Sequence, residues 1–250
     1  IVTKNNDFFI MKTYGLIGKN ISYSFSRNYF DNKFKNEEIS NCQYINFDTD
    51  NLSELNNIFN TDNYGFNVTI PYKETIIPYL DSLDFHAEQI GAVNTIKIEN
   101  EKKIGFNTDW IGFKKSLEPL LKPHHKKALI LGTGGASKAV IYALKQLQIQ
   151  TLIVSRNGKT TYEDLSEEII QNNTIIINCT PVGTFPNTDS APEIPYQFIT
   201  KNHLVYDLIY NPAETLFLKK CKENGAVTKN GLEMLEIQAE ESWKIWNSSY

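Results

Sequence analysis

A glycine-rich loop near the middle of the chain is the clearest chemical signal in the sequence. Residues 127–138 read KALILGTGGASK, an apolar strand followed by glycines and the start of a helix. Gly132 permits a tight turn, Gly134 lets the backbone approach a pyrophosphate, and the helix N-terminus offers unpaired N–H groups to it. A plain tight turn is the competing interpretation, but the strand–loop–helix context favours a dinucleotide site. The predicted cofactor-binding residues here are Gly132, Thr133, Gly134, Gly135 and Ala136.

The next predicted strand indicates which dinucleotide is bound. In an NAD site, an Asp or Glu about 20 residues further on binds the ribose hydroxyls. Here the strand ends in Val154, Ser155, Arg156 and Asn157, with no carboxylate. A guanidinium can bind a 2′-phosphate through paired charge-assisted hydrogen bonds, whereas an acid would repel it. A surface arginine beside a turn is the alternative. The pattern favours NADP, with Ser155 and Arg156 at the cofactor.

Polar residues in the N-terminal half lie where an α/β sheet presents ligand-binding groups, at strand ends and in the loops beyond them. Ser24 and Ser26 follow the first predicted strand, Asn67 and Thr69 alternate along the third, and Asn94 lies in the fourth. Taken alone, the serines fit better a solvated loop with a helix cap at Ser26.

Lys73 and Asp109 are the charged candidates of this half. Lys73 stands at the start of a predicted helix over residues 72–80, where a cation gains nothing from the helix dipole. This mismatch indicates another role for Lys73. Asp109 also fits a structural role, as a cap or first-turn acid of a predicted helix over residues 107–121.

Short β-rich runs alternate with helical patterns along most of the chain, which is typical of an α/β fold with a mainly parallel sheet. The predicted strands cover residues 14–18, 43–47, 66–70, 93–98, 127–131, 151–155, 174–178 and 204–208. The other predicted helices cover residues 26–35, 52–59, 137–146, 162–171, 213–223 and 232–246.

Two domains are expected, because 250 residues lie at the upper edge for one domain and suffice for two. A helical connection over residues 107–121 suggests domains held in a defined relation, with a cleft for a small ligand. Residues 11–109 and 230–250 are predicted to form an α/β substrate-binding domain, to which the last helix returns. Residues 110–229 are predicted to form a Rossmann-like NADP-binding domain.

Composition limits the possible partners. The formal net charge is −4 and no basic patch dominates, which argues against nucleic acid. The sequence has no run of about 18 apolar residues, so no membrane span is expected. Cys42, Cys179 and Cys221 form an odd, widely spaced set without a CxxC, which suits reduced thiols in a cytoplasm. The four histidines show no metal-binding spacing.

Eight segments together resemble the shikimate dehydrogenase family, and the match runs from Tyr14 to Trp246. The segments are GKNISYSFS (18–26), GFNVTIPYKE (65–74), GAVNT (91–95), GFNTD (105–109), GTGGAS (132–137), NCTPVG (178–183), YDLIYNPAET (206–215) and NGLEMLEIQA (230–239). Some are weak individually, but eight in the right order at suitable spacing are highly specific.

The resemblance implies a reversible NADPH-dependent reduction of 3-dehydroshikimate to shikimate, a step in chorismate and aromatic amino-acid biosynthesis. It implies that Lys73 and Asp109 are the catalytic pair and that Ser24 and Ser26 hold the substrate carboxylate. The remaining implied roles are ring-hydroxyl binding by Asn67, Thr69, Asn94 and Gln238, closure of the site by Tyr210, and contact near the nicotinamide by Thr180 and Gly231.

The sequence departs from the family pattern in places without losing a proposed catalytic group. The first motif usually has Asn-Pro where Lys19 and Asn20 stand, His where Tyr23 stands and Pro where Arg27 stands. Ser155-Arg156-Asn157 replaces the usual Asn-Arg-Thr and keeps the central arginine. Glu233 replaces a common glycine near the nicotinamide region.

Two other functions are compatible with the same fold. A quinate/shikimate dehydrogenase of dual specificity would be expected to prefer NAD and to carry an acid near position 156, where Arg156 stands. A non-catalytic metabolite sensor would be expected to lose Lys73 or Asp109, and both are present. The sequence is compatible with a monomer or a homodimer.

Overall fold

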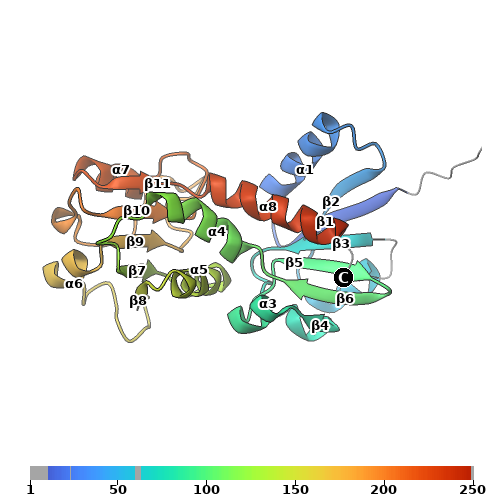
Figure 1. The fold of residues 1–250 in the computed structure, drawn as a ribbon, viewed down its shortest axis with the longest axis horizontal. Helices are drawn as coiled ribbons and strands as arrows, with labels where there is room; N and C mark the ends of the chain where they lie inside the picture. Colours follow the sequence, from blue (N-terminus) through green and yellow to red (C-terminus); the bar gives the residue numbers. More distant parts are fainter. Residues whose placement is uncertain (1–10, 23, 60–62, 249–250) are drawn as a thin grey trace, which may run out of the picture. The chain divides into compact units, whose positions relative to one another are not determined.

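The computed structural model describes residues 11–22, 24–59 and 63–248, so the first ten residues and Tyr23 lie outside it. The chain forms two compact units (Figure 1). Unit 1 comprises Ile1–Glu88, Val93–Phe106 and Ser242–Tyr250, and unit 2 comprises Gln89–Ala92 and Asn107–Glu241. The predicted domain limits after residues 109 and 229 stay a prediction. The two compact units are divided at other points, after residue 106 and within the last helix.

Unit 1 is built on a six-stranded sheet in the order β2-β1-β3-β5-β6-β4. The strands are β1 (Lys12–Gly18), β2 (Cys42–Asp48), β3 (Asn63–Val68), β4 (Ser82–Leu83), β5 (Thr95–Glu99) and β6 (Lys102–Phe106). Only β5 runs antiparallel to its neighbours. The start of β5 therefore lies at the same edge as the carboxyl ends of β1, β3 and β6. This confirms a mainly parallel sheet.

Aromatic side chains cover one face of this sheet. Helix α1 (Phe25–Asn36) places Phe30 against Tyr44 of β2, with ring centroids 4.6 Å apart. From helix α8 (Leu232–Asn247), Trp246 stacks on Tyr14 at 4.8 Å and donates from Nε1 to the Ile96 carbonyl oxygen at 3.0 Å. The end of α8 thus packs within unit 1, which confirms that the last helix returns to the first part of the chain.

The predicted helix over residues 72–80 is wrong. This segment forms consecutive turns and a short 3₁₀ helix, η2 (Ile77–Tyr79). Pro78 lies inside the predicted helix, and a proline there removes a donor and clashes with the preceding turn. Because no α-helix begins at this point, the dipole argument for a special role of Lys73 no longer applies. The helix over residues 52–59 is confirmed only in part, as η1 (Leu52–Glu54) and α2 (Leu55–Phe59).

Unit 2 is built on a parallel five-stranded sheet in the order β11-β10-β9-β7-β8. The strands are β7 (Lys127–Leu131), β8 (Gln150–Val154), β9 (Ile175–Asn178), β10 (Leu204–Asp207) and β11 (Val227–Lys229). The chain passes from β7 outward to β8 and then returns to β9 on the other side of β7. Ligands of open α/β sheets bind beyond the carboxyl ends of the strands at such a switch point.

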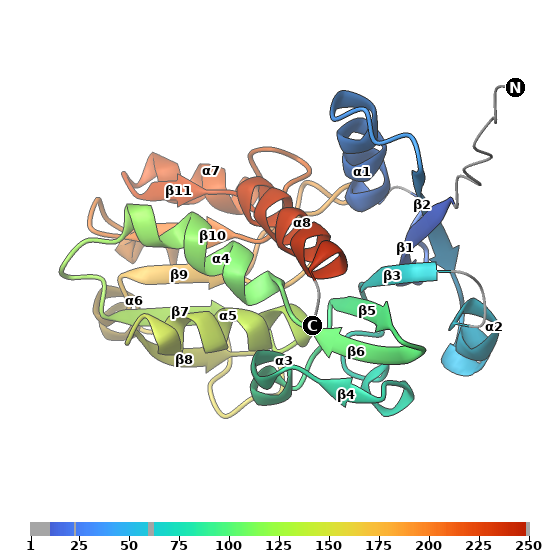
Figure 2. The ribbon, with the colours of Figure 1, turned by 45° about the vertical axis from the view of Figure 1, so that its right-hand side comes forward.

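Helices cover both faces of this sheet (Figure 2). Helices α4 (Asp109–Leu117) and α5 (Gly135–Gln146) pack on one face against Ala128 and Ile130. Helices α6 (Glu167–Asn172) and α7 (Leu216–Glu223) pack on the other against Leu129 and Leu131. Burial on both faces explains why the central strands β7, β9 and β10 are mainly apolar rather than alternating, whereas the edge strands β8 and β11 are partly exposed. Helix α3 (Phe85–Ile90) and strands β4, β6 and β11 were not predicted.

Two predicted helices of unit 2 begin later than expected, because each has a capping hydroxyl at its true start. Ser166 accepts from the Ile169 N–H at 3.3 Å and begins α6, and Thr215 accepts from the Leu218 N–H at 3.3 Å and begins α7. Such a side chain satisfies one of the free N–H groups of the first turn. The helices predicted from residues 162 and 213 therefore start at Glu167 and Leu216.

Substituting Gly65→Ala is expected to destabilise the protein. A Cβ at this position would collide with the Trp246 indole and lie 2.9 Å from the Ile96 carbonyl oxygen. Overpacking of this kind costs about 1–3 kcal/mol. Thermal denaturation should show a Tm lower by several degrees. Gly134→Ala is the matched control, because a Cβ there meets no atom within 4 Å among the described residues. An unchanged Tm for Gly65→Ala would contradict the packing described.

Candidate functional site

The glycine loop of unit 2 lies at the switch point of its sheet. Gly132 directly follows β7, has a φ of +104°, and donates its N–H to the Val154 carbonyl oxygen at 2.8 Å. A Cβ at Gly132 would lie 2.9 Å from Cγ2 of Thr180, so both the conformation and the space require glycine. The structure therefore brings the glycine loop and Thr180 together, as expected if both serve one ligand.

The start of α5 is open toward this loop. Gly134 is the N-cap of α5 and, among the described residues, no side chain caps the helix. The side chain of Ser137 instead donates to the Gly134 carbonyl oxygen at 2.6 Å. Free N–H groups and the positive end of the helix dipole attract anions, and the space beside Gly134 lets one approach the backbone. This arrangement can bind a pyrophosphate.

Arg156 follows β8, next to β7 in the same sheet, and is exposed. The turn that carries it is closed by a hydrogen bond from the Ser155 N–H to the Thr160 carbonyl oxygen at 3.2 Å. Arg156 pairs with no carboxylate in the described part of the chain. Its guanidinium therefore stands available at the same sheet edge as the glycine loop, which suits the predicted contact with a 2′-phosphate.

The loop after β10 and the residue before α8 are fitted to each other. The Gly231 N–H donates to the Ile209 carbonyl oxygen at 3.1 Å, and any Cβ at Gly231 would collide with the Leu208 carbonyl group. Only glycine allows this approach. Tyr210, which follows in the same loop, is half-buried, and burial raises the pKa of its phenol.

Asp109 and Gln238 lie on two helices of unit 2 that cross at a glycine. Asp109 is the first residue of α4 and is buried. A Cβ at Gly112 would lie 2.5 Å from the Met234 carbonyl oxygen and 3.2 Å from Cβ of Gln238, so α4 and α8 approach closely there. Asp109 lies less than one helical turn before the crossing. The structure thus places these two predicted residues on neighbouring helices.

In unit 1, Lys73 and Asn94 are held at one sheet edge by backbone hydrogen bonds. The Val93 N–H donates to the Lys73 carbonyl oxygen at 2.7 Å, and the Val68 N–H donates to the Asn94 carbonyl oxygen at 2.9 Å. The Thr69 N–H donates to the Ile17 carbonyl oxygen at 2.9 Å, which holds the end of β3 against β1. Thr69, Lys73 and Asn94 therefore gather at the edge expected for ligand binding.

Ser24 and Ser26 begin α1 at this edge. Ser24, not Ser26, is the N-cap residue, and it makes no side-chain cap. Its Oγ is buried without a hydrogen-bond partner among the described residues. Ser26 makes a side-chain hydrogen bond with Tyr44, whose pKa burial raises. A buried hydroxyl without a partner is costly unless a ligand completes it.

Asn67 is the centre of a buried hydrogen-bond network. Its Oδ1 accepts from Tyr44 Oη at 2.8 Å, and its Nδ2 donates to Ser242 Oγ at 2.9 Å and to Thr95 Oγ1 at 3.3 Å. Thr95 Oγ1 lies 2.8 Å from Ser242 Oγ. Both ends of the amide are engaged by protein atoms, so the predicted ligand contact of Asn67 stays a prediction. Sequence reasoning missed Tyr44 and Ser242, because neither lies in a segment that marks a site.

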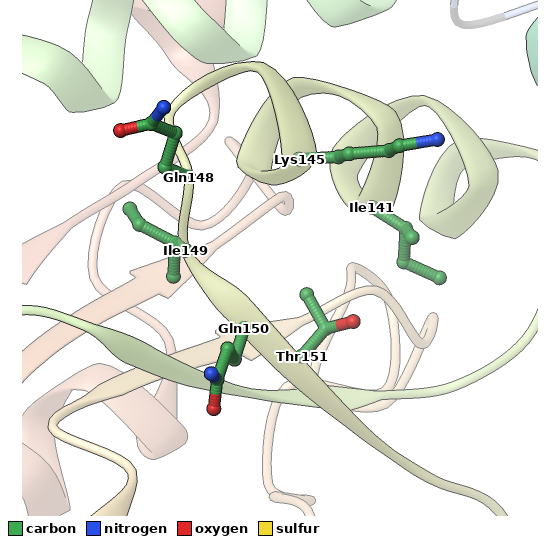
Figure 3. Close-up of a pocket in the computed structure, with 6 residues that line it drawn as sticks. All are labelled: Ile141, Lys145, Gln148, Ile149, Gln150 and Thr151. Atoms are coloured by element: carbon green, nitrogen blue, oxygen red, sulfur yellow. The ribbon is translucent and has the colours of Figure 1, made fainter.

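A shallow hollow elsewhere in unit 2 is separate from this site. It encloses about 360 Å³ between α5 and the start of β8 (Figure 3). Its lining residues are Ile141, Lys145, Gln148, Ile149, Gln150 and Thr151. Because it lies at the amino end of β8, it is at the sheet edge opposite the glycine loop.

Neither a metal cluster nor a disulfide is found in the part of the chain that the structure describes. No group of three or more His, Cys, Asp or Glu side chains there is placed to hold a metal ion. Cys42, Cys179 and Cys221 are unpaired. Across the described ranges, no helix has the length and apolar character needed to cross a membrane.

Known proteins resemble this chain along nearly its whole length. Residues 16–96 match the family model described as the shikimate dehydrogenase substrate binding domain. A Methanococcus maripaludis protein named shikimate dehydrogenase (NADP(+)) is 44% identical over 260 residues, covering 94% of this chain and 91% of its own. The crystal structure of shikimate dehydrogenase from Aquifex aeolicus matches with a TM-score of 0.85 and 38% identity, over 95% of this chain and 92% of that one. That of Thermus thermophilus shikimate 5-dehydrogenase, in complex with NADP(H) and shikimate, matches with a TM-score of 0.84 and 26% identity, over 95% and 94%.

Proposed function

The chain belongs to the shikimate dehydrogenase family, and on this basis we propose that it catalyses the reversible NADPH-dependent reduction of 3-dehydroshikimate to shikimate. The main support for this proposal is the switch point of unit 2. Gly132 and Thr180 are in contact there, α5 begins there without a side-chain cap among the described residues, and the exposed Arg156 lies at the same sheet edge. A sheet edge of this construction binds a dinucleotide phosphate. The reaction serves chorismate and aromatic amino-acid biosynthesis.

The cofactor is NADP. The glycine loop and the start of α5 would hold its pyrophosphate, and Arg156 would bind the 2′-phosphate. Thr180 and Gly231 would stand near the nicotinamide, since Thr180 contacts the glycine loop and Gly231 is fixed against the loop after β10. These groups fit a phosphorylated dinucleotide.

We assign Lys73 and Asp109 as the catalytic pair. Lys73 lies at the unit 1 edge where β3 ends and β5 begins, and β6 ends at the same edge three residues before Asp109. Bound NADPH supplies the hydride to the substrate carbonyl carbon. The Lys73 ammonium stabilises the negative charge that develops on the carbonyl oxygen and donates a proton to it. In the reverse direction the neutral Lys73 amine would remove the hydroxyl proton, and the role proposed for the Asp109 carboxylate is to bind a neighbouring hydroxyl of the substrate.

The substrate carboxylate would be bound by Ser24 and Ser26. Ser24 Oγ is buried and lacks a hydrogen-bond partner among the described residues, so it is ready to donate to an anion. Thr69 and Asn94 at the same edge would bind ring hydroxyls, as would Gln238 of unit 2, and Tyr210 would close the site. Asn67 would contribute less directly, because its amide already holds Tyr44 and Ser242.

The alternative functions are not favoured. Arg156 stands where an NAD-preferring enzyme of dual quinate and shikimate specificity would be expected to have an acid. Lys73 and Asp109, which a non-catalytic sensor would be expected to lose, are both present. The three unpaired cysteines fit our proposal that the enzyme acts in a cytoplasm. We propose that it is a monomer or a homodimer.

Replacing Lys73 with alanine should lower kcat by about two or more orders of magnitude, with a modest effect on KM, because a general acid contributes about 10²–10⁴-fold. Steady-state kinetics with 3-dehydroshikimate and NADPH measure this. Lys102→Ala is the matched control, since Lys102 is exposed at the opposite edge of the same sheet. Near-normal turnover by Lys73→Ala would remove Lys73 from catalysis.

Arg156→Ala should weaken NADPH binding about tenfold or more and leave NADH binding nearly unchanged, since a hydrogen bond to a charged group contributes about 1.5–3 kcal/mol. Fluorescence titration with each cofactor gives the two dissociation constants. Lys127→Ala provides the comparison, because this exposed cation begins β7 at the other edge of the sheet. Equal losses for both cofactors would rule out the 2′-phosphate contact.

A further inference from the structure

A carboxylate is buried in unit 2 between the two loops that carry Thr180 and Tyr210. Asp207, the last residue of β10, is fully buried. Its titratable neighbours in the described part of the chain are Cys179, Cys221 and Tyr196, and no cation there pairs with it. Burying an ionisable acid without a cation is unfavourable for the fold. We therefore expect the Asp207 carboxylate to have a specific role.

Three donors from three different segments converge on this carboxylate. Asn178 Nδ2 and the Ile209 N–H donate to Oδ1 at 3.0 and 3.1 Å, and Thr215 Oγ1 donates to Oδ2 at 2.6 Å. Asn178 ends β9, Ile209 lies in the loop after β10, and Thr215 is the N-cap of α7. One side chain thus joins the ends of two strands to the start of a helix.

The charge of Asp207 favours one orientation of the Asn178 amide, whose Nδ2 donates to Asp207 Oδ1 and makes a longer hydrogen bond, at 3.5 Å, to the Val182 carbonyl oxygen. An ionised carboxylate only accepts hydrogen bonds, so Asn178 must turn its Nδ2 toward it. Its Oδ1 then faces the next loop, where it accepts from the Thr180 N–H at 3.0 Å and from Thr180 Oγ1 at 2.6 Å. Thr180 in turn contacts the glycine loop at Gly132.

The same carboxylate fixes the segment before Tyr210. The Ile209 N–H is held by Asp207, and the Ile209 carbonyl oxygen accepts from the Gly231 N–H at 3.1 Å. The three residues that we place nearest the nicotinamide and over the substrate, Thr180, Gly231 and Tyr210, are therefore each one or two contacts from Asp207.

We propose that Asp207 is a positioning residue for hydride transfer, whose carboxylate sets the Asn178 amide and thereby holds Thr180 in place. This inference rests on the proposed function, because Thr180 receives its role there. Asp207 acts through Asn178 and Thr180 and is not proposed to contact substrate or cofactor.

The pKa of Asp207 indicates that its charge has a positioning role rather than a stabilising one. Burial raises the pKa of Asp207 to about 6, although its three hydrogen-bond donors lower it. Because this value lies above the ordinary 3.8, Asp207 ionises more readily in the unfolded chain than in the folded protein. Its contribution to the free energy of unfolding therefore falls as pH rises from 3.8 to about 6. The charge therefore does not stabilise the protein at neutral pH. Removing it should affect the loop more than the fold.

The test is Asp207→Asn, which keeps the shape of the side chain and removes its charge. At pH 7.5 its Tm should lie at or above that of the wild type, while kcat for 3-dehydroshikimate reduction falls about tenfold at saturating NADPH, within the range of couplings between contacting residues. Glu167→Gln is the control, because it neutralises an exposed acid of unit 2 on α6. A lower Tm with unchanged kcat would assign Asp207 a purely structural role and overturn the proposal.

A double-mutant cycle with Thr180→Val shows whether the effect passes through Thr180. Thr180→Val removes the hydroxyl that donates to Asn178. Adding Asp207→Asn to Thr180→Val should change kcat by less than about twofold, because the contact that Asp207 controls is already lost. The full tenfold loss in both backgrounds would overturn the proposal.

The pH profiles of kcat for the wild type and for Asp207→Asn give a further test. In the reduction direction kcat should fall below about pH 6, where Asp207 becomes protonated and can no longer act only as an acceptor. Asp207→Asn should lack this decrease, and a decrease of equal size in both proteins would contradict the proposal. A wild type that does not reduce 3-dehydroshikimate at any pH would instead refute the proposed function.

Discussion

Strand pairing determines where ligand-binding groups can gather in both units, because it leaves free backbone groups mainly at the strand ends. Inside a sheet, backbone donors and acceptors are consumed by neighbouring strands, so groups that bind ligands gather where strands end. In unit 1 the reversed strand β5 starts at the edge where β1, β3 and β6 end, and this brings Asn94 beside Lys73. In unit 2 the return from β8 to β9 sets Thr180 beside Gly132.

Both edges combine rigid backbone with unsatisfied polar groups. The glycine loop is fixed by a bond to Val154 and by its fit against Thr180, yet the first turn of α5 remains without a side-chain cap in the described residues. Ser24 shows the same combination, with a fixed position at the start of α1 and a buried hydroxyl without a partner among those residues. Such sites lose little further order on binding, which favours affinity.

Much of the fold followed from the sequence because burial leaves a strong pattern. The strand 127–131 matches β7 at both ends, since strands buried on two faces are continuously apolar. The hairpin between β5 and β6 was missed, because Asn100 and Glu101 adopt left-handed backbone without the glycine that marks such turns. The predicted helix over residues 72–80 is wrong because Pro78 is incompatible with a helix interior. The candidate site followed from motifs, whereas the support from Tyr44, Ser242 and Asp207 depends on long-range contacts that no local pattern encodes.

The most direct measurement is cofactor oxidation by the purified protein with 3-dehydroshikimate and, separately, with 3-dehydroquinate, each in the presence of NADPH or NADH. We expect rapid oxidation of NADPH with 3-dehydroshikimate and a much slower reaction in the other three combinations. Equal rates with both substrates, a preference for NADH, or no oxidation by the folded protein would contradict it.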